Sequence, residues 1–253
     1  MSTLPPSTSQ APLVMVIGAT SDVGKALAHH YAAAGSPLVL TVRDADRFQA
    51  DAEDLRLRYG VAVDVVACDV LDIGRHAVML DALPRLPDIV VCVVGVLGDQ
   101  AVSARDEGAA RLVMDSNYVA PALLLGALAN RFEARGSGVL VGISSVAGDR
   151  GRASNYIYGS AKAGFTAFLS GLRARLSRTP VHVVTVKPGF IDTRMTAGMK
   201  LPPALTAQPE EVAAAIARAV TKRRNVIYVR PVWGLIMCII RHVPEALFKK
   251  LKF

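Results

Sequence analysis

LVMVIGATSDVG, residues 13–24, is an apolar run that ends in a turn with a glycine at each end, Gly18 and Gly24. The apolar helical pattern of residues 26–28 follows directly, so the stretch predicts a strand, a turn and a helix. A helix that begins after such a turn presents unpaired N–H groups and a positive dipole end, which together suit a pyrophosphate. Two glycines at this spacing also occur in many other strand-to-helix turns, and Asp22 alternatively caps the helix.

Short apolar runs alternate with longer segments of helical periodicity along the rest of the chain. We expect strands at residues 13–17, 37–42, 61–67, 89–94, 138–143, 181–186 and 225–229. Near-continuous apolar runs imply strands buried on both faces, and the helices between them allow right-handed parallel crossovers. The sequence therefore predicts an α/β fold with a single doubly wound parallel sheet of the Rossmann type, covered by helices on both faces.

The composition favours one domain. A chain of 253 residues that is 52% hydrophobic is long enough for a large core, with no shift in composition that demands a second. We expect a disordered N-terminal arm at residues 1–12, the α/β domain at 13–231, and an apolar and basic segment at 232–253. The arm lacks the apolar region of a signal peptide, which favours a cytoplasmic protein.

The cysteines and histidines do not predict a metal site. Cys68, Cys92 and Cys238 are far apart and mostly lie in apolar runs, which indicates reduced, buried thiols. The five histidines are scattered and lack the spacing of metal ligands, so we expect them to be structural or surface residues.

The net charge of +8 is concentrated at the C-terminus. Residues 218–253 carry nine Lys and Arg against the single acid Glu245. This argues against nucleic-acid binding by the main body and indicates an anionic partner or surface at the tail. The apolar run 232–240 is shorter than the ~18 residues that span a bilayer, and no other run reaches that length. It predicts either peripheral contact with the inner face of a membrane or packing against a second subunit.

The end of the second expected strand bears on the choice of coenzyme. It reads Thr41-Val42-Arg43, with no acid before the arginine. An acid here would hold the ribose 2′-hydroxyl of NAD(H), whereas an arginine suits a 2′-phosphate, so the pattern favours NADP(H) over NAD(H). Arg43 alternatively pairs with Asp44 or Asp46 in solvent. Asp69, after the third strand, lies where it either recognises an adenine amino group or caps a loop.

The stretch YIYGSAK, residues 156–162, places two phenols near one ammonium group. Residues four apart share a helix face, so Lys162 reaches Tyr158, and Tyr156 is more typical of a pocket wall or core. A neighbouring cation lowers the tyrosine pKa from ~10 by roughly 1 to 3 units, which would make Tyr158 a usable proton shuttle. The alternative is an ordinary i,i+4 helix pair.

These motifs, together with CDV at 68–70, Asn117 in DSNYVA, ISSVAG at 143–148 and KPGFIDT at 187–193, occur in an order that resembles the short-chain dehydrogenase/reductases. The resemblance extends from Leu13 over essentially the whole chain. It implies hydride transfer between a nicotinamide coenzyme and a keto or hydroxyl group. It also implies a role for each catalytic residue: Tyr158 donates the proton, Lys162 binds the ribose, Ser145 rather than Ser144 holds the substrate oxygen, and Asn117 holds a relay water.

The same resemblance implies a set of coenzyme-binding residues. They are Gly18, Thr20, Ser21, Asp22, Val23, Gly24, Arg43, Asp69, Val70, Gly95, Tyr158, Lys162, Pro188, Gly189, Ile191 and Thr193. Two departures from the family pattern are Asp22 in place of a central glycine, and Cys92-Val93-Val94-Gly95 in place of Asn-Asn-Ala-Gly.

Three stretches, GATSDVG, VGVLGD and the ending RHVPEALFKKLKF, are similar to the decaprenylphosphoryl-2-keto-ribose reductase subgroup, whose members reduce a lipid-linked keto sugar. The apolar residues of the expected lid at 195–209, Met195, Met199, Leu201 and Leu205, suit such a substrate, although lids are often apolar simply to exclude water. The resemblance also implies a homo-oligomer. Two other functions remain open: a reductase of small soluble carbonyl compounds, and a protein that binds NADP(H) without turnover.

Overall fold

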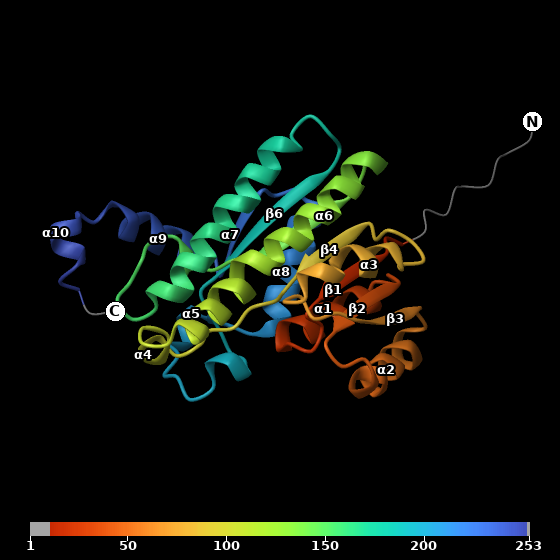
Figure 1. The fold of residues 1–253 in the computed structure, drawn as a ribbon, viewed down its shortest axis with the longest axis horizontal. Helices are drawn as coiled ribbons and strands as arrows, with labels where there is room; N and C mark the ends of the chain where they lie inside the picture. The colour runs from red at the N-terminus through yellow and green to blue at the C-terminus, as the bar shows by residue number, and fades with distance from the viewer. Residues whose placement is uncertain (1–10, 252–253) are drawn as a thin grey trace, which may run out of the picture.

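The computed structural model describes residues 11–251, so residues 1–10 of the expected N-terminal arm lie outside it. All seven expected strands form one parallel sheet in the order β3-β2-β1-β4-β5-β6-β9 (Figure 1). Their bounds are β1 Val14–Ile17, β2 Leu38–Val42, β3 Val63–Ala67, β4 Ile89–Cys92, β5 Val139–Ile143, β6 His182–Pro188 and β9 Val226–Val229. The predicted fold class is confirmed.

Two layers of helices cover the sheet, each with its own apolar core. On one face lie α1 (Asp22–Ala33), α2 (Gln49–Tyr59) and α8 (Pro209–Thr221). On the other lie α3 (His76–Asp81), α6 (Ala120–Arg135) and α7 (Tyr156–Arg175), with α6 and α7 side by side in Figure 1. Short helices α4 (Gln100–Ser103) and α5 (Glu107–Met114) lie between β4 and α6.

Burial on both faces holds for the central strands only. Every residue of β1, β4 and β6 is buried, as their continuous apolar runs predict. The expectation is wrong for β3 and β9 because they form the two edges of the sheet, where Asp64 and Val226 are exposed. The strand order reverses between β1 and β4, and ligands of open α/β sheets bind at such a point, beyond the carboxyl ends of the strands.

The helix that runs from Glu107 to Arg135 is long and apolar enough, by length and composition alone, to cross a membrane. This corrects the expectation that no segment reaches that length. The helix joins α5, a π-helical turn (Asp115–Val119) and α6. Its residues Leu124, Leu128 and Phe132 are fully buried in the core beneath the sheet, which accounts for the apolar composition.

The C-terminal segment packs against the loop that follows β5. Helix α9 (Val232–His242) buries Trp233 and Met237 beside Val146, and α10 (Glu245–Phe248) completes the segment at one end of the molecule (Figure 1). Arg150 holds the segment: its guanidinium donates to the carbonyl of Ile240 at 2.6 Å and lies 3.7 Å from the centre of the Phe248 ring. The opposite side of α9 is exposed.

The three cysteines are free thiols in three different environments. Cys92 is buried and Cys68 is half-buried, whereas Cys238 is exposed. The expectation of buried thiols is therefore wrong for Cys238, because α9 buries only the face that carries Trp233 and Met237.

Candidate active site

The loop between β1 and α1 is organised by a serine. Ser21 is the helix N-cap: its Oγ accepts a hydrogen bond from Gly24 N at 3.0 Å and donates to Gly18 O at 2.9 Å. The alternative that Asp22 is the cap is wrong, since Asp22 is already the first residue of α1. Gly18 has φ +90°, and a Cβ on Gly24 would lie 2.5 Å from Gly18 O, so both positions require glycine.

Asp22 instead binds an arginine from a distant segment. Arg194 donates to the Asp22 carboxylate from its backbone N and from Nε, each at 2.8 Å, and its Nη2 donates to Thr20 O at 2.6 Å. The link joins the first loop to the segment after β7 (Phe190–Ile191). Sequence reasoning missed Arg194, which lies 172 residues from its partner.

A cavity of about 370 Å³ opens at the carboxyl ends of the strands. The predicted site residues in its lining are Ser21, Asp22, Val23, Gly95, Asn117, Ser145, Tyr158, Lys162, Pro188, Gly189, Ile191 and Thr193. Gly18, Thr20 and Gly24 belong to the same first loop but are not in the lining. Arg43, Asp69 and Val70 lie elsewhere.

Ser145 and Tyr158 meet in this cavity. The Ser145 hydroxyl hydrogen-bonds the Tyr158 phenol, and its Oγ also accepts from Ala147 N at 3.1 Å. Ser144 faces helix α7, where its hydroxyl donates to Lys162 O at 2.9 Å and lies 2.6 Å from the Thr166 hydroxyl. Ser145 is therefore the serine that a substrate oxygen in the cavity would meet.

Lys162 lies one helical turn beyond Tyr158 on α7 and is buried. Its Nζ donates to Ile143 O at 3.0 Å and lies 5.8 Å from the centre of the Tyr158 ring. Burial lowers the pKa of Lys162 to about 8, because the charged form loses its solvation. The ammonium group still carries its proton at neutral pH.

The expected fall in the pKa of Tyr158 is not found. Burial raises it to about 12, and the hydrogen bond from Ser145 opposes this only in part. Loss of solvation disfavours the phenolate more strongly than the Ser145 hydrogen bond favours it. Tyr158 is therefore held as a protonated phenol at neutral pH.

Asn117 lies in the π-helical turn and is fully buried. Its Nδ2 donates to Val96 O at 2.7 Å and to Val113 O at 2.8 Å, while its Oδ1 has no hydrogen-bond partner among residues 11–251. A Cβ on Gly95 would lie 2.6 Å from that Oδ1 and 3.2 Å from Lys162 Nζ. Asn117 and Lys162 thus converge on the same point beside the end of β4.

Tyr156 is neither a wall of this cavity nor a core residue. It is the first residue of α7, its side chain is 49% exposed, and it is not in the cavity lining. The expectation of a pocket or core role is wrong because the first helical turn projects this position outward.

Besides Arg194, the wall contains further residues that the sequence did not predict, of which three come from distant or irregular segments. Arg152 and Asn155 come from the loop before α7, and Trp233 comes from α9. A Cβ on Gly189 would lie 1.9 Å from Trp233 Nε1, so glycine at this position admits the indole. Asn155 precedes Tyr156 and has the residue type of a helix cap, but its side chain does not cap α7. The asparagine before the start of α7 was the only nearby feature of the sequence that could have indicated these wall residues.

The expected lid contributes two methionines. Met195 and Met199 line the cavity, while Leu201 lines a neighbouring one. The later part of the segment is fixed, because Trp233 Nε1 donates to Leu205 O at 3.0 Å and Arg230 donates to Pro203 O at 2.8 Å.

Arg43 and Asp69 line a second cavity, also of about 370 Å³, with Arg75. Asp44 pairs with Arg47 at 3.1 Å, and Arg43 forms no ion pair within residues 11–251, so the alternative role as a partner of Asp44 or Asp46 is not found. Asp69 Oδ1 accepts from Leu71 N at 3.0 Å, which is the loop-capping alternative. The neighbouring Val70 carbonyl accepts from His76.

The glycine-lined strand end and the unpaired Asn117 oxygen fit a bound nicotinamide dinucleotide. A side chain at Gly18 would lie 3.1 Å from Val94, and one at Gly95 would meet Asn117. A ligand can therefore approach the backbone closely between the ends of β1 and β4. The N-terminus of α1 faces the same cavity. Within the described part of the chain, no group of three or more His, Cys, Asp or Glu is placed to hold a metal ion.

Comparisons with known proteins agree with this geometry. A family model for short chain dehydrogenases matches residues 12–202. An uncharacterised oxidoreductase of Mycobacterium tuberculosis is 39% identical over 231 residues, or 90% of this chain and 91% of the relative. An uncharacterised oxidoreductase of Streptomyces coelicolor is 36% identical over 248 residues, or 94% and 95% of the two chains.

Among solved structures, a short-chain dehydrogenase from Sphingobium yanoikuyae in complex with NADPH superposes with a TM-score of 0.78. It is 27% identical, and the match covers 93% of this chain and 97% of that one. The fold and the site together define a dinucleotide-binding oxidoreductase of the doubly wound class. The family match is specific, and the chain belongs to the short-chain dehydrogenases.

Proposed function

We propose that the protein is an NADP(H)-dependent ketoreductase that acts on a polyprenyl-phosphate-linked keto sugar. The observation that carries the reductase assignment is the meeting of Ser145, Tyr158, Lys162 and Asn117 around one cavity beyond the ends of β4 and β5. The lipid-linked substrate rests on the resemblance of the first loop and of the C-terminal sequence to that subgroup, and on the apolar character of the lid and of α9.

When bound, the coenzyme would supply hydride to the carbonyl carbon of the substrate. Ser145 orients the carbonyl oxygen, and Tyr158 donates its phenolic proton to the alkoxide that develops there. The raised pKa of Tyr158 keeps this proton in place at neutral pH until the alkoxide, a stronger base, takes it. Lys162 stabilises the resulting phenolate by its charge, and the free Oδ1 of Asn117 accepts from the water that returns a proton to the site.

The coenzyme contacts divide along the chain. The backbone N–H groups of Asp22 and Val23 would face the pyrophosphate, because those of Ser21 and Gly24 are used within the loop. Lys162 would bind the ribose, and the backbone from Pro188 to Thr193 would hold the carboxamide. The Asp22 carboxylate would repel the pyrophosphate by itself, and its ion pair with Arg194 offsets that charge. Asp69 and Val70 would lie beside the adenine.

Arg43 is proposed to hold the 2′-phosphate of NADP(H), so Arg43→Ala should raise the KM for NADPH by about 10- to 100-fold, the range of a charge-assisted hydrogen bond. The KM for NADH should change by less than about threefold. Steady-state oxidation of both coenzymes measures the ratio. Arg47→Ala, which removes a neighbouring exposed arginine already paired with Asp44, is the matched control. Equal use of NADPH and NADH by the wild type would contradict the assignment.

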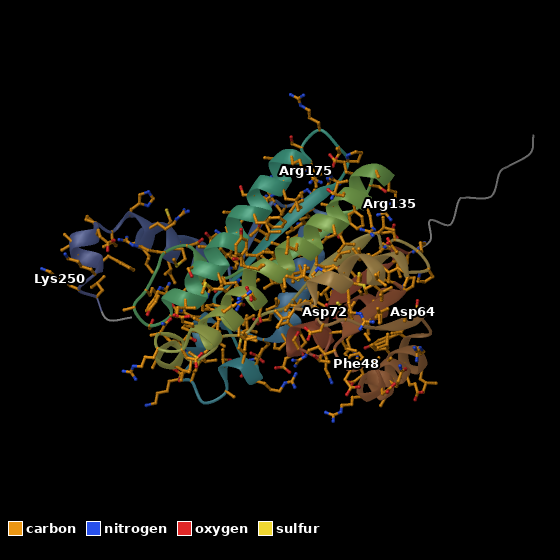
Figure 2. The ribbon with its side chains drawn as sticks, viewed as in Figure 1. Phe48, Asp64, Asp72, Arg135, Arg175 and Lys250 are labelled. Carbon is orange, nitrogen blue, oxygen red and sulfur yellow. The ribbon has the colours of Figure 1, made fainter. Side chains whose placement is uncertain are left out.

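We propose that the protein binds its lipid-linked substrate at a membrane surface. Helix α9 exposes Leu235 and Ile239, which are 66% and 60% exposed and lie four residues apart on one face. Lys249 and Lys250 lie nearby in the sequence, and Figure 2 places Lys250 at the end of the molecule opposite Asp64. Apolar burial and attraction to anionic lipids act together at such a surface.

Replacement of both apolar residues, Leu235→Asp with Ile239→Asp, should lower turnover of the lipid-linked ketone in anionic phospholipid vesicles by tenfold or more, because charged side chains prevent apolar contact with lipid. Turnover of water-soluble ribulose should change by less than about twofold. NADPH oxidation with both substrates measures this. Leu57→Asp, on α2 at the other end of the sheet, is the control, because Leu57 is exposed and lines no cavity described above. Unchanged vesicle turnover in the α9 variant would contradict membrane contact, and turnover of ribulose alone would indicate a reductase of soluble carbonyl compounds.

We also propose a cytoplasmic homo-oligomer. The exposed Leu112 and Leu123 on the long helix from Glu107 support an apolar contact with a second copy of the chain.

A further inference from the structure

Arg152 is a half-buried cation in the wall of the candidate catalytic cavity. Its Nε is inaccessible to solvent and has no hydrogen-bond partner among residues 11–251. Its Nη2 contacts the sulfur of Met237 at 3.4 Å, a weak acceptor. Burial lowers the pKa of Arg152 because the charged form loses solvation, and the charge of Asp149 opposes this only in part. A guanidinium with no direct ion pair in such a site is unfavourable by itself.

The acids around Arg152 are engaged elsewhere. Asp149 pairs with Lys187 and also accepts from the Tyr228 hydroxyl at 2.8 Å. Glu245 pairs with Arg150 at 2.9 Å. Arg152 therefore lines the cavity with no direct ion pair among the described residues, and only the field of Asp149 acts on its charge.

Arg152 also lies where two cavities adjoin. On one side is the cavity that contains Tyr158 and Asn155. On the other is a cavity of about 670 Å³ between residues 151–154 and the C-terminal segment, whose lining includes Lys249 and Lys250. The side of the site that leads away from the catalytic tyrosine thus carries three cations.

We propose that Arg152 binds an oxyanion on the substrate and so determines substrate specificity for ketones that carry a phosphate or a carboxylate. The inference rests on the proposed ketoreductase function, which places the keto group at Tyr158. A guanidinium binds such groups with two parallel hydrogen bonds, and the lysines beyond it favour the more highly charged phosphate. Asn155 Oδ1, which is buried and unpaired among the described residues, accepts from a substrate hydroxyl beside the oxyanion.

The first test compares NADPH-dependent turnover of ribulose, ribulose 5-phosphate and the keto acid 4-oxopentanoate by the full chain. The wild type should show a kcat/KM about 10- to 100-fold higher for ribulose 5-phosphate than for ribulose, mainly through KM. Arg152→Met should abolish this preference, and Arg152→Lys should restore part of it. The control Arg178→Met, which removes an exposed arginine outside the cavity, should keep it. Preference for 4-oxopentanoate over ribulose, lost in Arg152→Met, would identify the oxyanion as a carboxylate.

A binding measurement separates this inference from the proposed function. Trp233 is the only tryptophan in the chain and lines the same cavity, so its fluorescence reports occupancy. Ribulose 5-phosphate should change the fluorescence at concentrations about 10- to 100-fold below those that ribulose needs, and Arg152→Met should remove the difference.

The outcomes are distinguishable. If no ketone is reduced but phosphate-selective binding depends on Arg152, the proposed function fails and the anion site stands. If ketones are reduced and Arg152→Met affects charged and neutral ones equally in both measurements, Arg152 is only structural and the inference is overturned.

Discussion

Tyr158→Phe should lower kcat for ketone reduction by about 10²- to 10⁴-fold, the range that a positioned general acid contributes. The substitution removes the proton that Tyr158 donates and the hydrogen bond from Ser145, but it keeps the ring and its packing. The affinity for NADPH should change by less than about threefold, because the lysine assigned to the ribose remains. Single-turnover oxidation of NADPH and a separate coenzyme titration measure the two effects.

Tyr156→Phe is the matched control for this experiment. It makes the same chemical change two residues earlier on the same helix, where the side chain is half exposed and outside the cavity. It should leave kcat within about twofold of the wild type. If Tyr158→Phe behaves like Tyr156→Phe while cellular function is kept, the protein binds its coenzyme without turnover and the reductase proposal fails.

The sheet was predictable because its signals are local. Each central strand is a short apolar run between turn residues, and it is continuously apolar because it is buried on both faces. The residues that follow the strand ends could be placed in the site for the same reason, because the end of each strand is marked locally in the sequence. Parallel strands bring Gly18, Gly95 and Ser145 to one edge once the strand order is known. The burial of the interior strands was easier to predict than that of β3, where the edge position exposes Asp64.

The missed parts of the site depend on contacts between distant segments. Nothing near Asp22 identifies Arg194 as its partner, and nothing near Gly189 indicates that Trp233 will pack on it. An apolar run such as 232–240 has the same sequence pattern whether one face covers an active site or the whole run lies on a membrane. In the fold, Trp233 of α9 covers the candidate active site, whereas Leu235 of the same helix is exposed.

The acidity of Tyr158 shows a different limit. The i,i+4 spacing correctly placed Lys162 beside it, and the sign of a charge effect follows from that spacing. The opposing loss of solvation depends on how completely the surrounding residues bury the phenol, which spacing does not reveal. Burial also lowers the pKa of Lys162, so both members of the pair are held nearer their neutral forms than in water.

This balance gives the pH dependence of the reaction. Tyr158 stays protonated across the neutral range, so it should not limit reduction there. Lys162 loses its proton as pH rises through about 8, and the phenolate then loses its stabilising charge. Reduction by the wild type should therefore decline above about pH 8, and Lys162→Met should lower kcat by about 10²- to 10⁴-fold at pH 7.

The same lysine should make the folded protein less stable at neutral pH. Its pKa is about 8 when folded and near 10.5 when unfolded, so the unfolded chain binds the proton more tightly. The penalty is complete below pH 8 and disappears as pH rises toward 10.5. The free energy of unfolding of the wild type, measured relative to Lys162→Met, should therefore increase by about 2 to 3 kcal/mol between pH 7 and pH 10.

Urea denaturation of both proteins at the two pH values measures this difference. Titration of Tyr158 affects both proteins and largely cancels, and the unpaired Ile143 carbonyl left by the substitution adds a term that does not depend on pH. Lys222→Met, which removes an exposed lysine, should show no such change relative to the wild type. A constant difference between wild type and Lys162→Met would mean that Lys162 keeps an ordinary pKa when folded. The charge beside Tyr158 would then persist well above pH 8, and the decline in reduction at alkaline pH would require another group.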